Sequence, residues 1–239
     1  MALTFNGTSS KLEYISGASI ISTLPVSIFA WIKPTSAALT KAGYIGGMGD
    51  GSASSGLEPI LAGNDANDPF YGSSRASGTA VYDAAVASAA SAGVWTPCLT
   101  VYTSSTLRKA YFGAGTPAEG TTSNNPNIAN MLRINVGVRP STGNTVYFDG
   151  DIAEFAIWSS ALSDSNWTTL SGGATPSGVA SGSLVDYWSL TTQASTHTGT
   201  NGIVLTATST SQASDHPSIS GGSSAIAAIA TYHSNIRRA

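Results

Sequence analysis

The stretch from Leu132 to Leu170 constrains the fold more than any other part of the chain. It opens with LRINVGV, in which apolar and polar side chains alternate as in a strand with one buried face, the other facing solvent or ligand. A turn, a second strand, a tight turn at Phe148–Gly150 and a third strand, DIAEFAIW, follow. Ser163 is then placed to cap one helical turn, with Asp164 near its positive end. This order predicts an all-β domain with very little helix.

Two segments nearer the N-terminus support the same class. Residues 26–33, VSIFAWIK, place apolar side chains on both faces, which predicts a strand covered on both sides and ended by Pro34. Residues 3–16 predict strand, turn and strand, with Asn6 and Gly7 as the turn pair. Residues 41–93 are the least regular, and the Ala-rich piece AVYDAAVASAASAG fits strand or helix.

The composition argues against nucleic acid and a membrane as partners. Only 10% of the 239 residues are charged, against about 25% in ordinary soluble domains. A surface so poor in charge is weakly protected against association, so we expect copies packed against neighbours or an extracellular location. The net charge is −3 and the basic residues are scattered, so nucleic acid is not an expected partner. No apolar run approaches the ~20 residues of a membrane span, and no signal peptide is visible.

Several segments, in the right order, resemble the laminin G-like, concanavalin A-like lectin-glucanase family. They are LTFNGTSSKL, SIFAWIKP, GVWTPCLTVY, YFDGDIAEFAIW and LVDYWSL, and they span about residues 3–219. The resemblance implies an all-β, two-sheet antiparallel jelly-roll sandwich over residues 1–219, a fold that serves binding and assembly more often than catalysis. An immunoglobulin-type sandwich is the alternative, but the Cys…Trp…Cys spacing is missing and the chain is twice the ~100 residues of such a domain.

Catalytic chemistry is not expected. Relatives that hydrolyse glucans carry three acidic residues at alternate positions, which places them on one face of a strand. The nearest set here is Asp149, Asp151 and Glu154, whose spacing puts Glu154 on the opposite face, while Gly150 is expected to break the strand. Glu154, with apolar neighbours on its own face, is expected to accept backbone N–H groups. The histidines, at positions 197, 216 and 233, are interpreted as loop residues rather than bases.

The resemblance raises calcium as a candidate ligand, because many relatives bind it at the rim of the sandwich. The candidate ligands are Asp65, Asp68, Asp149 and Asp151. The family often has an acidic residue where this chain has Ala153, and Asn/Asp clusters usually make turns. We therefore expect no metal and no cofactor, with these four carboxylates as the place to look for calcium.

Aromatic residues suggest core packing first and sugar contacts second. Four tryptophans lie in strand patterns, which favours the core: Trp31, Trp95, Trp158 and Trp188. Trp167 is expected to fix the helical turn to the sheet. If a sugar site exists, the polar loop around Tyr71, with Arg75 and Asp68, is the candidate. Cys98, the single cysteine, is expected to be buried and reduced.

The last twenty residues fall outside the resemblance. Gly221 and Gly222 are interpreted as a hinge, followed by an amphipathic segment with apolar residues at helical spacing. The candidate docking residues are Ile226, Ile229, Tyr232, Ile236, Arg237 and Arg238, with His233 on the same stripe. The alternatives are a tail that folds back on the sandwich or frays.

Two functional classes follow from these patterns. The first is a non-enzymatic structural or decoration protein of a large assembly, such as a bacteriophage capsid or tail. It would be made in the host cytoplasm, lie at the virion surface and contact copies of itself or a capsid or tail protein. The second is a stand-alone carbohydrate-binding or adhesion module of a bacterial surface protein, which would lie outside the cell and bind surface glycans.

Overall fold

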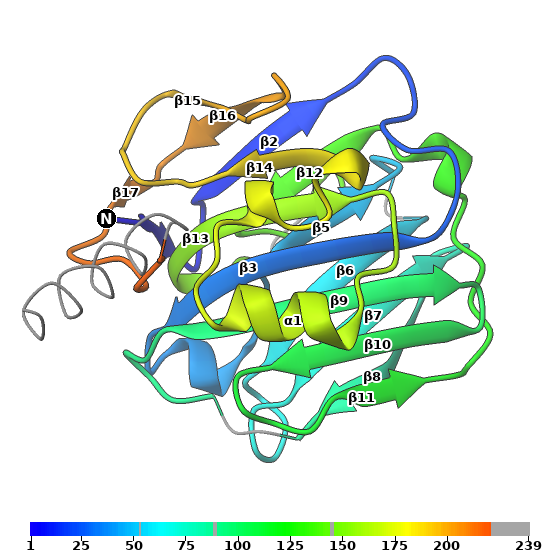
Figure 1. Ribbon diagram of the computed structural model, residues 1–239, viewed down its shortest axis with the longest axis horizontal. Helices are drawn as coiled ribbons and strands as arrows, with labels where there is room; N and C mark the ends of the chain where they lie inside the picture. Colours follow the sequence, from blue (N-terminus) through cyan, green and yellow to red (C-terminus); the bar gives the residue numbers. More distant parts are fainter. Residues whose placement is uncertain (53, 88–89, 144–145, 221–239) are drawn as a thin grey trace, which may run out of the picture.

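The chain folds as two antiparallel β-sheets packed face to face (Figure 1). The computed structural model describes residues 1–52, 54–87, 90–143 and 146–220. Within these residues the α-helical content is one helix, α1 (Asp164–Ser171), beside short 3-10 turns at Ala38–Thr40, Ile128–Asn130, Pro176–Gly178 and Ser181–Ser183. The predicted all-β, two-sheet sandwich is therefore confirmed.

The first sheet has the order β11-β10-β9-β3-β13-β1-β17, and β14 pairs with β13 beside β1. Its strands are β1 (Leu3–Asn6), β3 (Val26–Pro34), β9 (Thr96–Ser104), β10 (Leu107–Phe112), β11 (Ala118–Gly120), β13 (Asp149–Trp158), β14 (Leu184–Trp188) and β17 (Ser211–Gln212).

The second sheet has the order β15-β16-β2-β12-β5-β6-β7-β8, and β4 pairs with β6. Its strands are β2 (Lys11–Ile15), β4 (Ala42–Tyr44), β5 (Gly46–Gly49), β6 (Gly56–Ala62), β7 (Phe70–Ala76), β8 (Thr79–Val86), β12 (Arg133–Val136), β15 (Thr196–Thr198) and β16 (Val204–Thr208). The described residues of the irregular region 41–93 thus supply five strands, and the first half of the Ala-rich piece is a strand.

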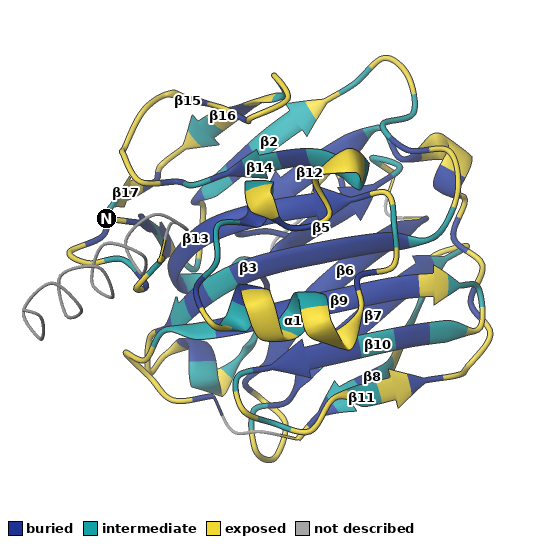
Figure 2. Ribbon diagram, in the orientation of Figure 1, coloured by how far each residue is buried: buried dark blue, intermediate teal, exposed yellow. Residues whose placement is uncertain are grey.

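The main core lies between the sheets, and a second apolar cluster lies outside the first sheet. On β3, Val26 and Ile28 face the main core, whereas Phe29 faces the outer cluster, as the alternation predicts. Helix α1 covers this outer cluster (Figures 1 and 2), and Trp167 packs there with its ring centre 5.3 Å from that of Tyr111. The strand is therefore covered on both sides, as expected.

Buried residues confirm two further expectations and refine a third. Cys98 is buried as a free thiol, and its Sγ atom lies 3.3 Å from the carbonyl oxygen of Ala30. Trp158 and Trp188 are fully buried in the core. Trp95 precedes β9 and is only half-buried, with the ammonium group of Lys33 5.6 Å from its ring centre.

One local expectation was wrong. The tight turn at Phe148–Gly150 is not formed, because β13 begins at Asp149 and continues through Gly150 between β1 and β3. A Cβ atom at position 150 would overlap the carbonyl oxygen of Lys33, so glycine allows close approach of the strands rather than breaking one. The predicted strand, turn and strand over residues 3–16 is present, and the turn at Asn6 and Gly7 carries the chain from β1 in the first sheet to β2 in the second.

Three short strands follow β14, which the resemblance gave as the last core strand. β15 and β16 extend the second sheet beside β2, and β17 pairs with β1 at the edge of the first sheet. Residues 221–239, with the predicted hinge and docking residues, lie outside the described residues.

Candidate functional site

The outer face of the second sheet carries two neighbouring depressions, which form the candidate site. Strand β5 has the sequence GGMG, and Met48 faces the core. Residues 138–143, here called the crossing loop, run over β5; a Cβ atom at Gly49 would overlap the carbonyl oxygen of Pro140. The backbone N–H of Thr142 donates to Gly51, at 3.0 Å. The glycine-rich strand therefore lets this loop lie directly on the sheet.

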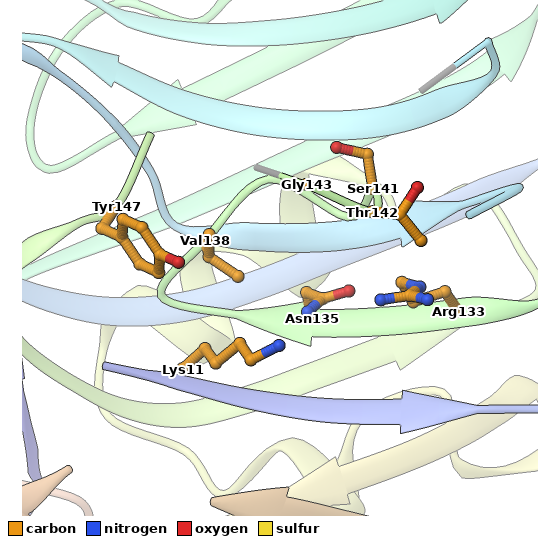
Figure 3. Close-up of a pocket in the computed structure, with 8 residues that line it drawn as sticks. All are labelled: Lys11, Arg133, Asn135, Val138, Ser141, Thr142, Gly143 and Tyr147. Carbon is orange, nitrogen blue, oxygen red and sulfur yellow. The ribbon is translucent and has the colours of Figure 1, made fainter. Parts of the chain in front are cut away.

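The first depression, here called the polar pocket, has a volume of about 380 Å³. Figure 3 shows Arg133 and Asn135 side by side on β12, with Ser141 of the crossing loop opposite them. Its lining consists of Lys11, Arg133, Asn135, Val138, Ser141, Thr142, Gly143 and Tyr147. The sequence alternation in LRINVGV predicted that Arg133 and Asn135 face solvent or ligand, and both line this pocket.

A carboxylate beside the polar pocket partly balances its positive charge. Glu13 on β2 lies 3.2 Å from the ammonium nitrogen of Lys11 and also accepts from the guanidinium of Arg133. Burial alone would raise the pKa of Glu13, but Lys11 and Arg133 outweigh it and hold that pKa below its usual value. Three buried polar atoms at the pocket have no hydrogen-bond partner within the described chain: Arg133 Nε, Asn135 Oδ1 and Ser141 Oγ.

The second depression, here called the tyrosine pocket, has a volume of about 390 Å³. Its rings belong to Tyr44, Tyr71 and Tyr82; Tyr71 and Tyr82 meet edge to face with ring centres 5.9 Å apart. The Tyr71 hydroxyl donates to Asp65 at 3.1 Å. Burial and the Asp65 carboxylate together raise the pKa of Tyr71. The rest of the lining is Ala42, Ile60, Ala62, Asn64, Asp65 and Val146.

A buried ion pair lies under the crossing loop. The Glu58 carboxylate, 1% exposed, contacts the Arg75 guanidinium through two N···O pairs of 3.2 and 3.3 Å. Arg139 of the crossing loop adds a contact of 3.8 Å. Burial raises the pKa of Glu58, although both arginines oppose the shift. This pair joins β6 to β7 and helps to hold the crossing loop.

The predicted sugar candidates have separate places. Tyr71 lies in the tyrosine pocket, but on strand β7 rather than in a loop. Arg75 is 8% exposed and paired with Glu58, so the expectation that it lies exposed in a polar loop was wrong. Asp68 belongs to the turn with Asp65, and it is not part of the pocket lining. Sequence reasoning missed Tyr44 and Tyr82, because only the pairing of β4, β6, β7 and β8 brings them to Tyr71.

The calcium candidates do not form a ligand set. Asp149 lies 3.1 Å from the ammonium nitrogen of Lys41, and Asp151 lies 3.2 Å from that of Lys33. Asp65 accepts the hydroxyl of Tyr71. In the described part of the chain, no three His, Cys, Asp or Glu side chains gather as metal ligands would. As arranged, these residues do not fit a calcium site, and the absence of a bound metal stays a prediction.

Glu154 has different partners from those expected. It is buried at an irregularity in β13, where the register against β3 shifts between Ala153 and Ala156, so the simple alternation fails. The hydroxyl of Tyr187 donates to its carboxylate at 2.5 Å, and His216 Nε2 lies 3.1 Å from the other oxygen. The expected backbone donors are therefore replaced by side chains. His216 is a loop residue, as predicted, and its half-buried side chain pairs with the buried Glu154 carboxylate.

The fold is that of a lectin-like β-sandwich. The family model described as the Concanavalin A-like lectin/glucanases superfamily matches residues 6–166. The chain therefore belongs to this superfamily, as the sequence resemblance indicated. Among the curated proteins, none has significant sequence similarity to this chain. In the described residues, no helix has the length and apolar character needed to cross a membrane.

Solved structures share the fold at low sequence identity. A putative carbohydrate binding protein from Bacteroides ovatus has a TM-score of 0.57 at 14% identity; the match covers 90% of this chain and 62% of that one. Domain 4 of an extracellular arabinanase from Geobacillus stearothermophilus, in complex with arabinotriose, has a TM-score of 0.56 at 21% identity. That match covers 70% of this chain and 75% of the other. A heptameric SAP-like pentraxin from Limulus polyphemus has a TM-score of 0.55 at 14% identity, and that match covers 71% of this chain and 80% of the other. At these identities the likeness establishes the fold alone.

Proposed function

We propose that this protein is a non-enzymatic glycan-binding protein whose binding surface is the outer face of the second sheet. The tyrosine pocket carries the proposal. Sugar rings present C–H groups to aromatic faces and hydroxyl groups to polar neighbours, and most binding sites combine apolar walls with a few placed polar groups. Tyr71 and Tyr82 supply the rings, and Asp65 and Asn64 supply the polar groups.

Similar structures make the same proposal reasonable. One is named a putative carbohydrate binding protein, and another was solved with arabinotriose. The three acidic residues nearest to a catalytic set, Asp149, Asp151 and Glu154, favour binding over hydrolysis, because each has a structural partner. Asp149 and Asp151 face lysines, and Glu154 is held by Tyr187 and His216.

The test is glycan-array screening followed by calorimetric titration of the oligosaccharides that bind. Tyr71→Ala removes the ring and should weaken binding about fivefold or more, because a stacked ring contributes on the order of 1 kcal/mol or more. Tyr71→Phe keeps the ring and should retain most of the affinity. Release of reducing ends from a bound glycan would contradict the non-enzymatic part. Binding that survives Tyr71→Ala unchanged would contradict the site.

An assembly role is the second candidate, and the low charge of the chain supports it. With 10% charged residues, the surface has little electrostatic protection against association. In this role the protein would decorate a large particle such as a bacteriophage capsid or tail, with residues 221–239 as the docking arm. The size of the native particle tests it, together with a variant that lacks this tail. Full incorporation of the shortened chain would exclude the tail as the anchor.

A further inference from the structure

We propose that the polar pocket binds the carboxylate of an acidic sugar. This inference rests on the glycan-binding function and adds a substrate class to it. The tyrosine pocket can accept neutral rings, whereas the polar pocket has a different chemistry on the same face of the sheet.

The charge of the polar pocket favours an anion. Lys11 and Arg133, the two lining side chains that are charged at neutral pH, are both cationic. The Glu13 carboxylate beside them already contacts both groups. Two positive charges and one negative charge leave one positive charge in excess. A ligand carboxylate would balance this excess, whereas a neutral sugar would not.

Arg133 has an edge that suits a carboxylate. Its NH1 group donates to Glu13, while Nε is buried and has no partner in the described residues. This edge faces Gly51: a Cβ atom built there would lie 3.8 Å from Nε and 3.9 Å from NH2. The Nε–NH2 edge of guanidinium matches a carboxylate through two parallel hydrogen bonds. Because Nε is closed to water, a small movement of the pocket wall must accompany this contact.

The remaining polar groups fit a sugar better than a simple anion. Ser141 Oγ lacks a partner in the described chain and can donate to the carboxylate. Asn135 Oδ1, also without a partner there, is an acceptor; it would repel an anion and attract a sugar hydroxyl. A buried polar group left unpaired costs roughly 1–3 kcal/mol. A ligand with an acidic group beside a hydroxyl would satisfy both atoms together.

The two pockets are close enough to serve one glycan. Val146 lines the tyrosine pocket, and its neighbour Tyr147 lines the polar pocket. Successive residues of this extended segment thus point to different depressions, as in a strand. One oligosaccharide can therefore place a ring on the tyrosines and an acidic unit in the polar pocket.

The experiment compares acidic oligosaccharides with their methyl esters, which remove the charge and keep the sugar. The panel contains oligogalacturonates, glucuronate-containing oligosaccharides and sialylated oligosaccharides, each paired with its ester, together with sulfated oligosaccharides. Calorimetric titration should give at least one acid that binds about tenfold more tightly than its ester, with an advantage that shrinks as salt rises. Lys11→Gln should remove most of this advantage. Lys109→Gln, an equal change of charge on the first sheet, should leave it intact.

The outcomes separate the two proposals. Equal affinity for acids and esters, with binding still lost in Tyr71→Ala, would overturn the acidic-sugar inference and leave glycan binding in place. The acidic-sugar inference would also be overturned if Lys11→Gln and Lys109→Gln changed the affinity advantage of acids over esters by the same factor. A preference for sulfated members over all carboxylates would also overturn the inference. Failure of every neutral and acidic member to bind would overturn both proposals.

Discussion

The Nε2 atom of His216 lies 3.1 Å from the Oε1 atom of Glu154, so the segment after β17 contacts the middle of β13. The other ring nitrogen, Nδ1, lies 2.8 Å from the carbonyl oxygen of Pro217. The Nε2 contact is one of charge rather than an aligned hydrogen bond, and it is favourable together with the Nδ1 contact only when the imidazole is protonated. The nearby Lys33 is itself paired with Asp151 and Asp215.

This relationship predicts that the protein loses stability as the solution becomes alkaline. Burial lowers the pKa of His216, but Glu154 and the Pro217 carbonyl outweigh it and raise that pKa above 6.5. A histidine whose pKa is raised by folding contributes stability fully below its unfolded pKa and loses it as pH rises through the folded pKa. The free energy of unfolding, measured with urea, should therefore fall as pH rises from about 6.5.

The His216→Gln variant should be less stable at pH 5.5 and should show a smaller decrease toward pH 9. His197→Gln is the matched control, because burial lowers the pKa of His197 and places its titration on the acid side of 6.5. It should leave the alkaline decrease unchanged. An alkaline decrease of equal size in His216→Gln would show that another group causes it.

Cys98 should be unreactive in the folded protein. Burial raises the pKa of its thiol far above the ordinary value, and the thiolate is the form that reacts. A thiol reagent added at pH 8 should label the native protein over hours and the urea-unfolded protein within seconds to minutes. Fast labelling without denaturant would mean that the region around β9 opens readily.

The alternation of side chains between two faces predicted the strands well where a strand pairs regularly with both of its neighbours. The faces of Val26–Lys33 follow the sequence pattern because β3 lies in the centre of a sheet, between β9 and β13. Gly150 and Glu154 did not follow it. The conformation at Gly150 depends on how closely β3 approaches it. The position of Glu154 depends on the irregular pairing of β13 with β3. Neither effect can be recognised from the sequence of β13 alone.

The candidate site was predicted only in fragments. The polar face of LRINVGV identified Arg133 and Asn135, and the aromatic argument identified Tyr71. The pockets themselves require the crossing loop to lie on β5, a contact between residues distant in the sequence. Arg75 was expected at the surface because polar composition around it suggested a loop, whereas Glu58 draws it into a buried pair.

Ser163 should contribute measurably to the stability of α1. Its hydroxyl accepts the backbone N–H of Asn166 at 3.2 Å, and the Asn166 side chain accepts that of Ser163 at 3.0 Å. Ser163→Ala should lower the free energy of unfolding by about 1 kcal/mol. Thr169→Ala, an exposed change in the same helix, should stay within about 0.5 kcal/mol of the parent. Equal effects of the two changes would argue against the cap.

Gly49→Ala should damage both the fold and the polar pocket. A Cβ atom at this position would overlap the carbonyl oxygen of Pro140, and backbone atoms cannot rotate away as a side chain can. The crossing loop must then lift from β5, and Ser141 and Thr142 move with it. We expect the free energy of unfolding to fall by roughly 1–3 kcal/mol, the usual range for an added methyl group in a packed site.

Binding of acidic oligosaccharides to Gly49→Ala should fall more than binding of neutral ones, because the loop forms one wall of the polar pocket. Gly17→Ala is the matched control, since a Cβ atom there would meet nothing within 4 Å. Its stability and its binding should equal those of the parent protein. If Gly49→Ala kept the stability of the parent protein and its preference for acidic over neutral oligosaccharides, the pocket would not require contact between the crossing loop and β5. The polar pocket would then be shaped by β2 and β12 alone.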